Sequence, residues 1–354
     1  MLKTFLFLAG LILSISAELD AVSKAKNLVL FLADGGGLPT VNAASIHGYG
    51  RPGALYLQRM PHIGLSETSS ASSWVTDSAA GMTAIVTGQK THNGVVSQSA
   101  TAERGRKDGE PLKTILEYAE ERGLSTGVVS NSSMADATPA ACYAHANDRS
   151  RHGEIFAQVL NPRFGDGVDV IIGSGRESIL EQTYALGIEL AVQLPKKGFV
   201  FLDRLERLHG VQANSGRVVA LFEEAFDLAE AVEIAIQILS RNPKGFFLMV
   251  ESNTHITPPA QDLARMVALD RIVQRTAERL RSNSLILFTA DHSHDLRLTK
   301  GTKGEDILPL IRSGDGTHTA EEVLATAEGP GADRVHGIFP NTYLFDVMMK
   351  AFGW

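Results

Sequence analysis

The sequence predicts an α/β fold built on a mostly parallel β-sheet. Three apolar segments without polar alternation, residues 27–33, 246–250 and 284–290, are typical of strands that are buried on both faces. Segments with apolar residues at helical spacing separate them, so strands alternate with helices along nearly the whole chain. No internal repeat, low-complexity segment or linker interrupts this alternation. We therefore expect residues 18–354 to form a single domain.

Residues 1–17 have the pattern of a secretory signal peptide. Lys3 precedes an apolar run of about ten residues, and small residues follow at Ser16 and Ala17. The run is too short for a bilayer span, which takes roughly 20 residues, although an uncleaved anchor is the alternative. We expect a protein exported to the periplasm or the extracellular space, with no membrane contact after cleavage.

The composition excludes several classes of protein. With 44% apolar and 21% charged residues, the chain is neither fibrous nor disordered. Its 33 basic and 40 acidic residues give a formal net charge of −7, which argues against nucleic acid as a stable partner. Cys142 is the only cysteine, so no intrachain disulfide can form and the core must stabilise the exported protein.

The first apolar strand ends abruptly at Asp34, which three glycines follow. Open α/β sheets bind their ligands at the carboxyl ends of parallel strands, and the glycines allow the backbone to turn close to whatever Asp34 holds. The alternative is an ordinary turn in which Asp34 only caps the next helix.

A second motif, WVTDSAAGMTAIVTGQKT at 74–91, contains a candidate nucleophile. Ser78 follows Asp77 and precedes small residues, so we expect a strand-like approach to turn into a helix at this serine. The free N–H groups and positive dipole end of a helix N-terminus favour an anion, phosphate above all. The simpler alternative is that Ser78 is only an N-cap residue.

The remaining elements follow from the same patterns. The sequence predicts helices at 108–122 and 226–240 and from 262 and 341 onward, with strands at 125–130, within 164–179 and within 199–205. After the strand at 125–130, Asp136 and Thr138 lie just before Pro139, a residue that suits the first helical turn, and Arg149 ends the segment. A capped helix with a solvent-exposed arginine is the alternative reading.

Two further strands end on polar residues. Glu251 follows the run at 246–250, whereas Asp291, His292 and His294 follow the run at 284–290. If these strands lie beside the one that ends at Asp34, their carboxylates converge and raise one another's pKa unless a cation neutralises them. Aspartate with histidine suits zinc, whereas Asp, Glu and a threonine hydroxyl suit magnesium.

A serine beside paired metals indicates phosphoryl transfer through a covalent phosphoserine. The planar guanidinium of Arg149 is well shaped to bind two phosphate oxygens at once.

These motifs resemble those of the alkaline phosphatase family, and they occur in family order from residue 27 to about 323. They are NLVLFLADGGGL, VTDSAAGMTA, DATPAACYAHANDR, FFLMVE, FTADHSH and GTHTAEEV. The resemblance implies an alkaline phosphatase-like three-layer sandwich, in which Ser78 is the nucleophile and Arg149 the phosphate clamp. It also implies two Zn²⁺ ions and one Mg²⁺ ion. The implied ligands are Asp34, Asp291 and His292 for the zinc beside Ser78, His318 for the zinc that activates water, and Asp136, Thr138 and Glu251 for magnesium, with Asp34 close to both the first zinc and the magnesium.

One segment departs from the family pattern. Family members usually carry an Asp five residues beyond the strand-ending Glu and a His four residues further on, both of which bind the water-activating zinc. Here Ile256 and Ala260 occupy these positions. We expect a rearranged loop in which His255 replaces a missing ligand, assisted by Asn253 or Thr257. The alternative is that His255 merely packs against the loop and that this zinc is weak or absent. His294 is a further candidate ligand, although we favour a supporting role for it, such as a hydrogen bond to the site.

The first hypothesis for function is an exported phosphomonoesterase of broad specificity, acting on small-molecule phosphate monoesters. A phosphodiesterase or sulfatase of the same superfamily is the second, and a phosphate- or metal-binding protein without turnover is the third. Zinc content separates catalysis from binding alone, because two zinc ions per chain favour catalysis and one favours the binding protein. Members of the family are often homodimers, but no segment of this sequence marks an interface.

Overall fold

The computed structural model describes residues 24–211, 216–256 and 258–354, so the expected signal peptide lies outside the described residues. The strands of its main sheet are β1 (Asn27–Asp34), β2 (His62–Glu67), β3 (Ser125–Ser133), β4 (Val170–Ser174), β5 (Phe199–Leu202), β6 (Arg217–Phe222), β7 (Phe246–Asn253), β8 (Ser284–Thr289), β11 (Val323–Glu328) and β12 (Gly337–Pro340). The ten strands lie in the order β12-β2-β11-β8-β1-β7-β3-β4-β6-β5. Every neighbouring pair from β8 to β5 is parallel, and only β11 runs against its neighbours. The predicted α/β fold with a mostly parallel sheet is confirmed.

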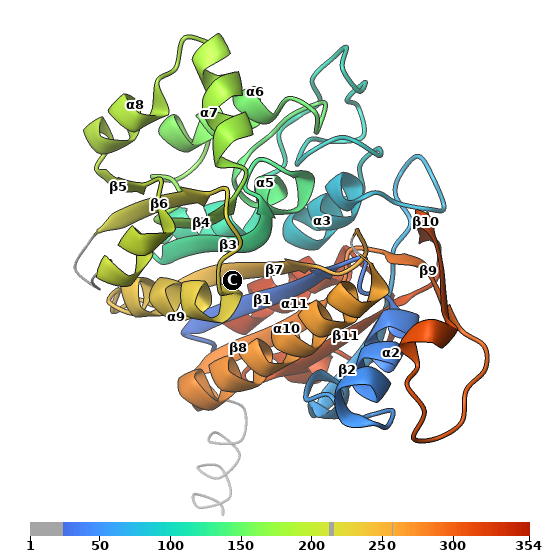
Figure 1. The fold of residues 1–354 in the computed structure, drawn as a ribbon. Helices are drawn as coiled ribbons and strands as arrows, with labels where there is room; N and C mark the ends of the chain where they lie inside the picture. Colours follow the sequence, from blue (N-terminus) through green and yellow to red (C-terminus); the bar gives the residue numbers. More distant parts are fainter. Residues whose placement is uncertain (1–23, 212–215, 257) are drawn as a thin grey trace, which may run out of the picture.

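Helices cover both faces of the sheet and complete the predicted three layers (Figure 1). One face carries α2 (Leu38–Tyr49), α9 (Leu228–Leu239) and α10 (Pro259–Leu280). The other carries α3 (Ser78–Thr87), α4 (Ile115–Glu121), α5 (Ala137–Tyr143), α6 (His152–Ala157), α7 (Arg176–Ala185), α8 (Leu190–Lys196) and α11 (Tyr343–Phe352). None of the helices in the described stretches is long and apolar enough to cross a bilayer.

Strict alternation along the central strands divides the core in two. In β7, Met249 packs in the layer of α3 and Val250 in the layer of α10, because successive side chains of a strand face opposite sides. Both faces are apolar until the carboxyl ends, which explains the unbroken apolar runs in the sequence. At those ends the same alternation directs polar side chains to both faces.

A separate hairpin, β9 (Ser293–Leu298) and β10 (Ile311–Thr319), was not predicted from the sequence. Its antiparallel pairing sets His294 opposite His318. The segment RSGDGTHT has neither an apolar run nor regular alternation, so nothing in it indicated a strand.

The predicted helix at 108–122 was too long. The helix α4 begins only at Ile115, because Thr114 and Glu117 form a reciprocal capping box at its start. Upstream, Gly109 donates its N–H to the Gln98 side chain, and the chain there is irregular. In contrast, α10 begins at Pro259 rather than Asp262, because proline is well tolerated in the first helical turn.

Glu120 on α4 is a buried carboxyl whose ionisation opposes folding. Burial raises its pKa to about 8, although Gly167 N–H and the Thr126 hydroxyl donate to it. Because the folded pKa lies above the ordinary value near 4.5, the folded state binds this proton more tightly than the unfolded state does. This contribution to stability is complete below about pH 4.5 and is lost as pH rises toward 8.

We predict that Glu120→Gln becomes more stable relative to the wild type as pH rises from 5 to 8.5. The difference should grow by at most about 1.4 kcal/mol per pH unit, measured by urea unfolding at several pH values. The matched control is Glu121→Gln, the partly exposed neighbour paired with Lys113, which should show no such trend. A pH-independent difference for Glu120→Gln would contradict the assignment.

Candidate active site

The three strands that end near a buried acidic residue, β1, β7 and β8, lie side by side. Strand β1 is flanked by β8 on one side and β7 on the other, so the ends that carry Asp34, Glu251 and Asp291 meet at one edge of the sheet. Asp34 pairs in register with Asn253 of β7. All three carboxylates are buried, with relative exposures of 3% or less. The convergence expected from the sequence is therefore confirmed.

The N-terminus of α3 brings Ser78 to this edge. Ser78 is the first residue of the helix, as predicted, and Asp77 is its N-cap, accepting from the N–H of Ala80. The Ser78 hydroxyl lies 3.3 Å from Nε2 of His292 and donates to Oδ1 of Asp34 over 3.5 Å. This places a buried hydroxyl at the positive end of a helix dipole and beside the carboxylates.

Two glycines permit the close approaches that build this edge. A Cβ on Gly81 of α3 would lie 2.9 Å from the carbonyl oxygen of Asp291, so the helix can pack against the end of β8 only without a side chain there. Gly35 has φ +70° and a Cβ on it would lie 2.6 Å from the His255 ring. The first glycine after Asp34 thus leaves room for His255.

Two groups of side chains in the described residues could hold a metal ion. One consists of Asp34, Asp291 and His292, and the other of His255, His292 and His318. In each group the ligand atoms lie within 4.8 Å of one another. His292 belongs to both groups.

The donors at this edge fit a cation. Oδ2 of Asp291, Oε1 of Glu251 and Nδ1 of His255 are buried atoms without a hydrogen-bond partner in the described structure. Unpartnered buried oxygens are costly unless a positive charge compensates them. Carboxylate oxygens with imidazole nitrogens are the ligands that zinc takes, whereas carboxylates with hydroxyls suit magnesium.

The pKa values show how strongly these groups interact. Burial and the nearby charge of Asp34 raise the pKa of Asp291 to about 6 and hold that of Glu251 well above its ordinary value. Burial would also raise the pKa of Asp34, but a hydrogen bond with His292 and the charge of His255 outweigh it and lower this pKa. A divalent cation would relieve the repulsion among all three carboxylates.

The rings of His292 and His318 are stacked, and their pKa values are shifted in opposite directions. Burial disfavours the charged form of His292, yet Asp291 and Asp34 raise its pKa to about 9. Burial and the charge of His292 lower the pKa of His318 to about 4, which keeps this ring neutral. Nδ1 of His318 lies 3.0 Å from the Thr76 carbonyl, so donation there leaves Nε2 as the free ligand atom.

His255 and His294 complete a cluster of rings. The ring centroid of His255 lies 5.3 to 5.8 Å from those of His292, His294 and His318. Nδ1 of His294 is 2.7 Å from the Gly35 carbonyl, to which it donates. His294 belongs to neither metal-capable group of the described residues.

Arg149 lies between two carboxylates. Its guanidinium donates to Asp77 over 3.1 Å and to Asp136 over 2.8 Å. Asp136 is also the N-cap of α5, and Thr138 is buried in the first turn of that helix. Neither close group includes Asp136 or Glu251, although the charge of Asp136 contributes to the raised pKa of Glu251.

Two polar contacts were missed in the sequence. The Ser130 hydroxyl donates to Oε2 of Glu251, and Ser130 pairs in register with this residue across β3 and β7. The Asn253 amide, expected only as an auxiliary zinc ligand, instead donates to Oδ2 of Asp34 over 3.3 Å. In both cases, the signal available in the sequence was a polar residue at the end of an apolar strand. Thr257, the other auxiliary candidate, lies outside the described residues.

Ser78, the first residue of α3, lies beside buried His and Asp groups that could hold a metal ion at the carboxyl edge of the sheet. This arrangement fits a hydrolase with a serine nucleophile. A family model described as alkaline phosphatase matches residues 25–191 and 222–315. The chain belongs to the alkaline phosphatase family, as the sequence motifs predicted.

The sequence is similar to those of several named phosphatases. It is 31% identical to an alkaline phosphatase of Gadus morhua, over 92% of this chain and 81% of that protein. It is 29% identical to the streptomycin-6-phosphate phosphatase of Streptomyces griseus, over 96% of this chain and 93% of that protein. The structure of alkaline phosphatase from the Antarctic bacterium TAB5 covers 94% of this chain with a TM-score of 0.78 and 26% identity, and 99% of that chain is matched. These relatives support a phosphatase.

We predict that divalent cations raise the melting temperature of the chelator-treated protein, because they bind the folded state alone. Asp291→Asn should reduce this rise. At pH 8 the metal-free variant should be at least as stable as the metal-free wild type, because it lacks a buried carboxylate whose raised pKa leaves it ionised. Asp295→Asn, a carboxylate paired with Arg297 outside both groups, is the control and should leave the rise unchanged. Equal rises in all three proteins would contradict a metal site at Asp291.

Proposed function

We propose that the protein is an exported phosphomonoesterase that hydrolyses phosphate monoesters through a covalent phosphoserine at Ser78. The main observation behind this proposal is the position of the Ser78 hydroxyl at a helix N-terminus. It lies 3.3 Å from Nε2 of His292, which belongs to a group of side chains that could hold a metal ion. The phosphatases among its relatives support the substrate class. Export is inferred from the pattern of residues 1–17.

The metal ligands follow from the two close groups and the buried glutamate. Asp34, Asp291 and His292 would hold a zinc ion beside Ser78, and His255 and His318 would hold a second. Asp136, Thr138 and Glu251 would hold magnesium. When bound, such cations lower the pKa of the serine hydroxyl and of water and stabilise the departing oxygen.

The side chains of the chain position the ester. Arg149 would bind two non-bridging phosphate oxygens, and Asp77 and Asp136 hold its guanidinium in place. The N-terminal turn of α3 favours the phosphoryl anion at Ser78. The Ser78 oxygen then bonds to phosphorus as the ester bond breaks, and the alcohol leaves with a proton. Water next cleaves the serine–phosphorus ester, which releases phosphate and restores the Ser78 hydroxyl.

The altered loop after β7 weakens one of the two zinc sites. Ile256 and Ala260, which occupy the usual ligand positions, are both exposed. A single Nε2 of His292 can bind only one ion. If it binds the ion beside Ser78, His255 and His318 are the remaining members of the second group. We therefore infer that the second zinc is held less tightly than the first.

We predict that Ser78→Ala lowers the release of p-nitrophenol from its phosphate ester at alkaline pH by at least about 10³-fold, since the nucleophile is lost. Metal content, measured by mass spectrometry, should stay near the wild-type value. Ser178→Ala, on the exposed face of α7, is the control and should retain full activity. A Ser78→Ala protein with normal turnover would remove Ser78 from the nucleophile position.

We predict that His255→Ala lowers zinc content by one ion per chain, because it deletes a ligand of the weaker group. Activity in limiting zinc should fall, and excess zinc should partly restore it. His47→Ala, an exposed histidine on α2, serves as the matched control. If zinc stoichiometry is unchanged in His255→Ala, His255 packs against the loop without binding metal.

A further inference from the structure

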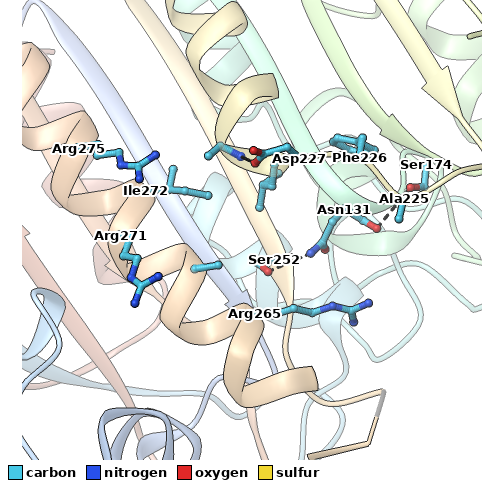
Figure 2. A pocket seen from close by; sticks show the side chains of 13 residues that line it. Asn131, Ser174, Ala225, Phe226, Asp227, Ser252, Arg265, Arg271, Ile272 and Arg275 are labelled. Carbon is cyan, nitrogen blue, oxygen red and sulfur yellow. Dashed lines mark hydrogen bonds between the residues drawn. The ribbon is translucent and has the colours of Figure 1, made fainter. Parts of the chain in front are cut away.

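Two asparagine side chains link the end of β7 to its neighbouring strands. The paired register of β3 and β7 ends at Ser130 and Glu251. Beyond this point the Asn131 side chain takes the place of a backbone partner, because its Oδ1 accepts the N–H of Asn253 over 2.9 Å. Its Nδ2 donates to the Ser252 hydroxyl over 3.0 Å, on the face of the sheet that α9 and α10 cover (Figure 2). Asn131 therefore extends the hydrogen bonding between β3 and β7 by two residues.

The Asn253 side chain lies on the opposite face of the sheet, in the candidate active site. Side chains alternate along β7, so Asn253 faces the site while the preceding Ser252 faces Asn131. Asn253 is 4% exposed, and both ends of its amide are used. Its Oδ1 accepts the N–H of His255 over 3.3 Å, and its Nδ2 donates to Oδ2 of Asp34 over 3.3 Å. One buried amide thus joins the ends of β1 and β7.

The orientation of both amides follows from their partners. A backbone N–H can only donate, so the side-chain atom that receives it must be the amide oxygen. The N–H of Asn253 thus identifies Oδ1 of Asn131, and the N–H of His255 identifies Oδ1 of Asn253. Nδ2 of Asn253 is then the atom that faces Asp34, whose ionised carboxylate can only accept. An amide serves both neighbours of Asn253, whereas a carboxylate there would lack the donor for Asp34.

The contact with Asn253 sets the direction of the Asp34 carboxylate. With Oδ2 held by the amide, Oδ1 lies 3.3 Å from Nε2 of His292, 3.5 Å from Nδ1 of His255 and 3.5 Å from the Ser78 hydroxyl. The same amide holds the backbone of His255. Asp34 belongs to one of the two groups that could hold a metal ion, and His255 belongs to the other. Asn253 therefore contacts one member of each group.

We propose that Asn253 is a positioning residue for Asp34 and His255, and that Asn131 holds it in place from the opposite face of the sheet. The inference rests on the proposed function, because it concerns the proposed zinc ligands. Groups that hydrogen-bond to metal ligands orient them, and their loss typically weakens metal binding by about 10- to 100-fold. The Asn131 side chain lies on the far side of β7 from these ligands, so its effect on zinc passes through the backbone of Asn253.

The test is the zinc affinity of the protein, measured by competition between the zinc-loaded chain and a chromophoric chelator. Asn253→Leu, which has a similar volume but no hydrogen-bonding groups, should weaken zinc binding by at least about tenfold. Asn131→Leu should weaken it by at least about threefold, since the N–H of Asn253 loses its acceptor. In the Asn253→Leu background, Asn131→Leu should add little, because the effects of residues that act through one another are not additive.

Asn131→Asp is the conservative variant. Its carboxylate still accepts the N–H of Asn253, and the rotatable Ser252 hydroxyl can donate to it, so zinc affinity should stay near the wild-type value. Asn242→Leu is the matched control, because the Asn242 side chain also accepts a backbone N–H, that of Lys244 over 3.0 Å, but lies before the first residue of β7. This control should leave zinc affinity unchanged.

Three outcomes would overturn the inference. They are wild-type zinc affinity in Asn131→Leu, equal losses in Asn131→Leu and Asn131→Asp, and full additivity of the Asn131→Leu and Asn253→Leu changes. The two Asn131 variants decide the question alone if Asn253→Leu does not fold.

The affinity measurement does not need turnover, so it separates this inference from the proposed function. A wild-type protein that binds zinc without releasing p-nitrophenol from its phosphate ester would contradict the phosphatase and leave the positioning role to the affinities. A phosphatase whose zinc affinity ignores the Asn131 changes would contradict the positioning role alone. A wild-type protein that binds no zinc would overturn both this inference and the proposed metal ligands.

Discussion

The burial of three carboxylates at the ends of adjacent parallel strands is the constraint on which the site depends. Asp34, Glu251 and Asp291 are buried at neighbouring positions near the ends of three adjacent strands. Burial and mutual repulsion raise the pKa of two of them, and only the contacts of Asp34 with His292 and His255 reverse this for the third. Such a group is costly as a stabilising element. The group is reasonable as a cation site, because a bound cation removes the repulsion among the carboxylates and this relief favours binding.

The sequence predicted six strands of this fold but not their arrangement, and it did not predict β2, β6, β11 and β12. Unbroken apolar runs identified β1, β7 and β8, because strands covered on both faces need apolar side chains at every position. Their order in the sheet could not be derived, since more than 200 residues separate β1 from the strands that flank it. The hairpin of β9 and β10 was missed because its residues carry no periodic pattern. The three-layer arrangement was predicted only from the resemblance to the alkaline phosphatase family, because periodicity does not reveal it.

The same limit applies to the site. Residue types and strand ends indicated Asp34, Asp291 and His292, and the motif around Ser78 indicated a helix N-terminus. Contacts that depend on the direction of a side chain were out of reach. The donation from Ser130 to Glu251 joins residues 121 positions apart, and it exists because β3 and β7 pair in one particular register. The membership of His292 in two groups is likewise a property of three-dimensional geometry alone.

Several contacts of neighbouring residues fix the position of His255. Thr254, the residue before it, donates both its N–H and its hydroxyl to the carbonyl oxygen of Asp34, over 3.0 and 2.7 Å. This fixes the loop where β1 and β7 end. Gly35, with its positive φ and no side chain, then leaves the space that the His255 ring fills. The backbone thus brings the His255 ring into the cluster of His292, His294 and His318, which is the position that the proposed second zinc site requires.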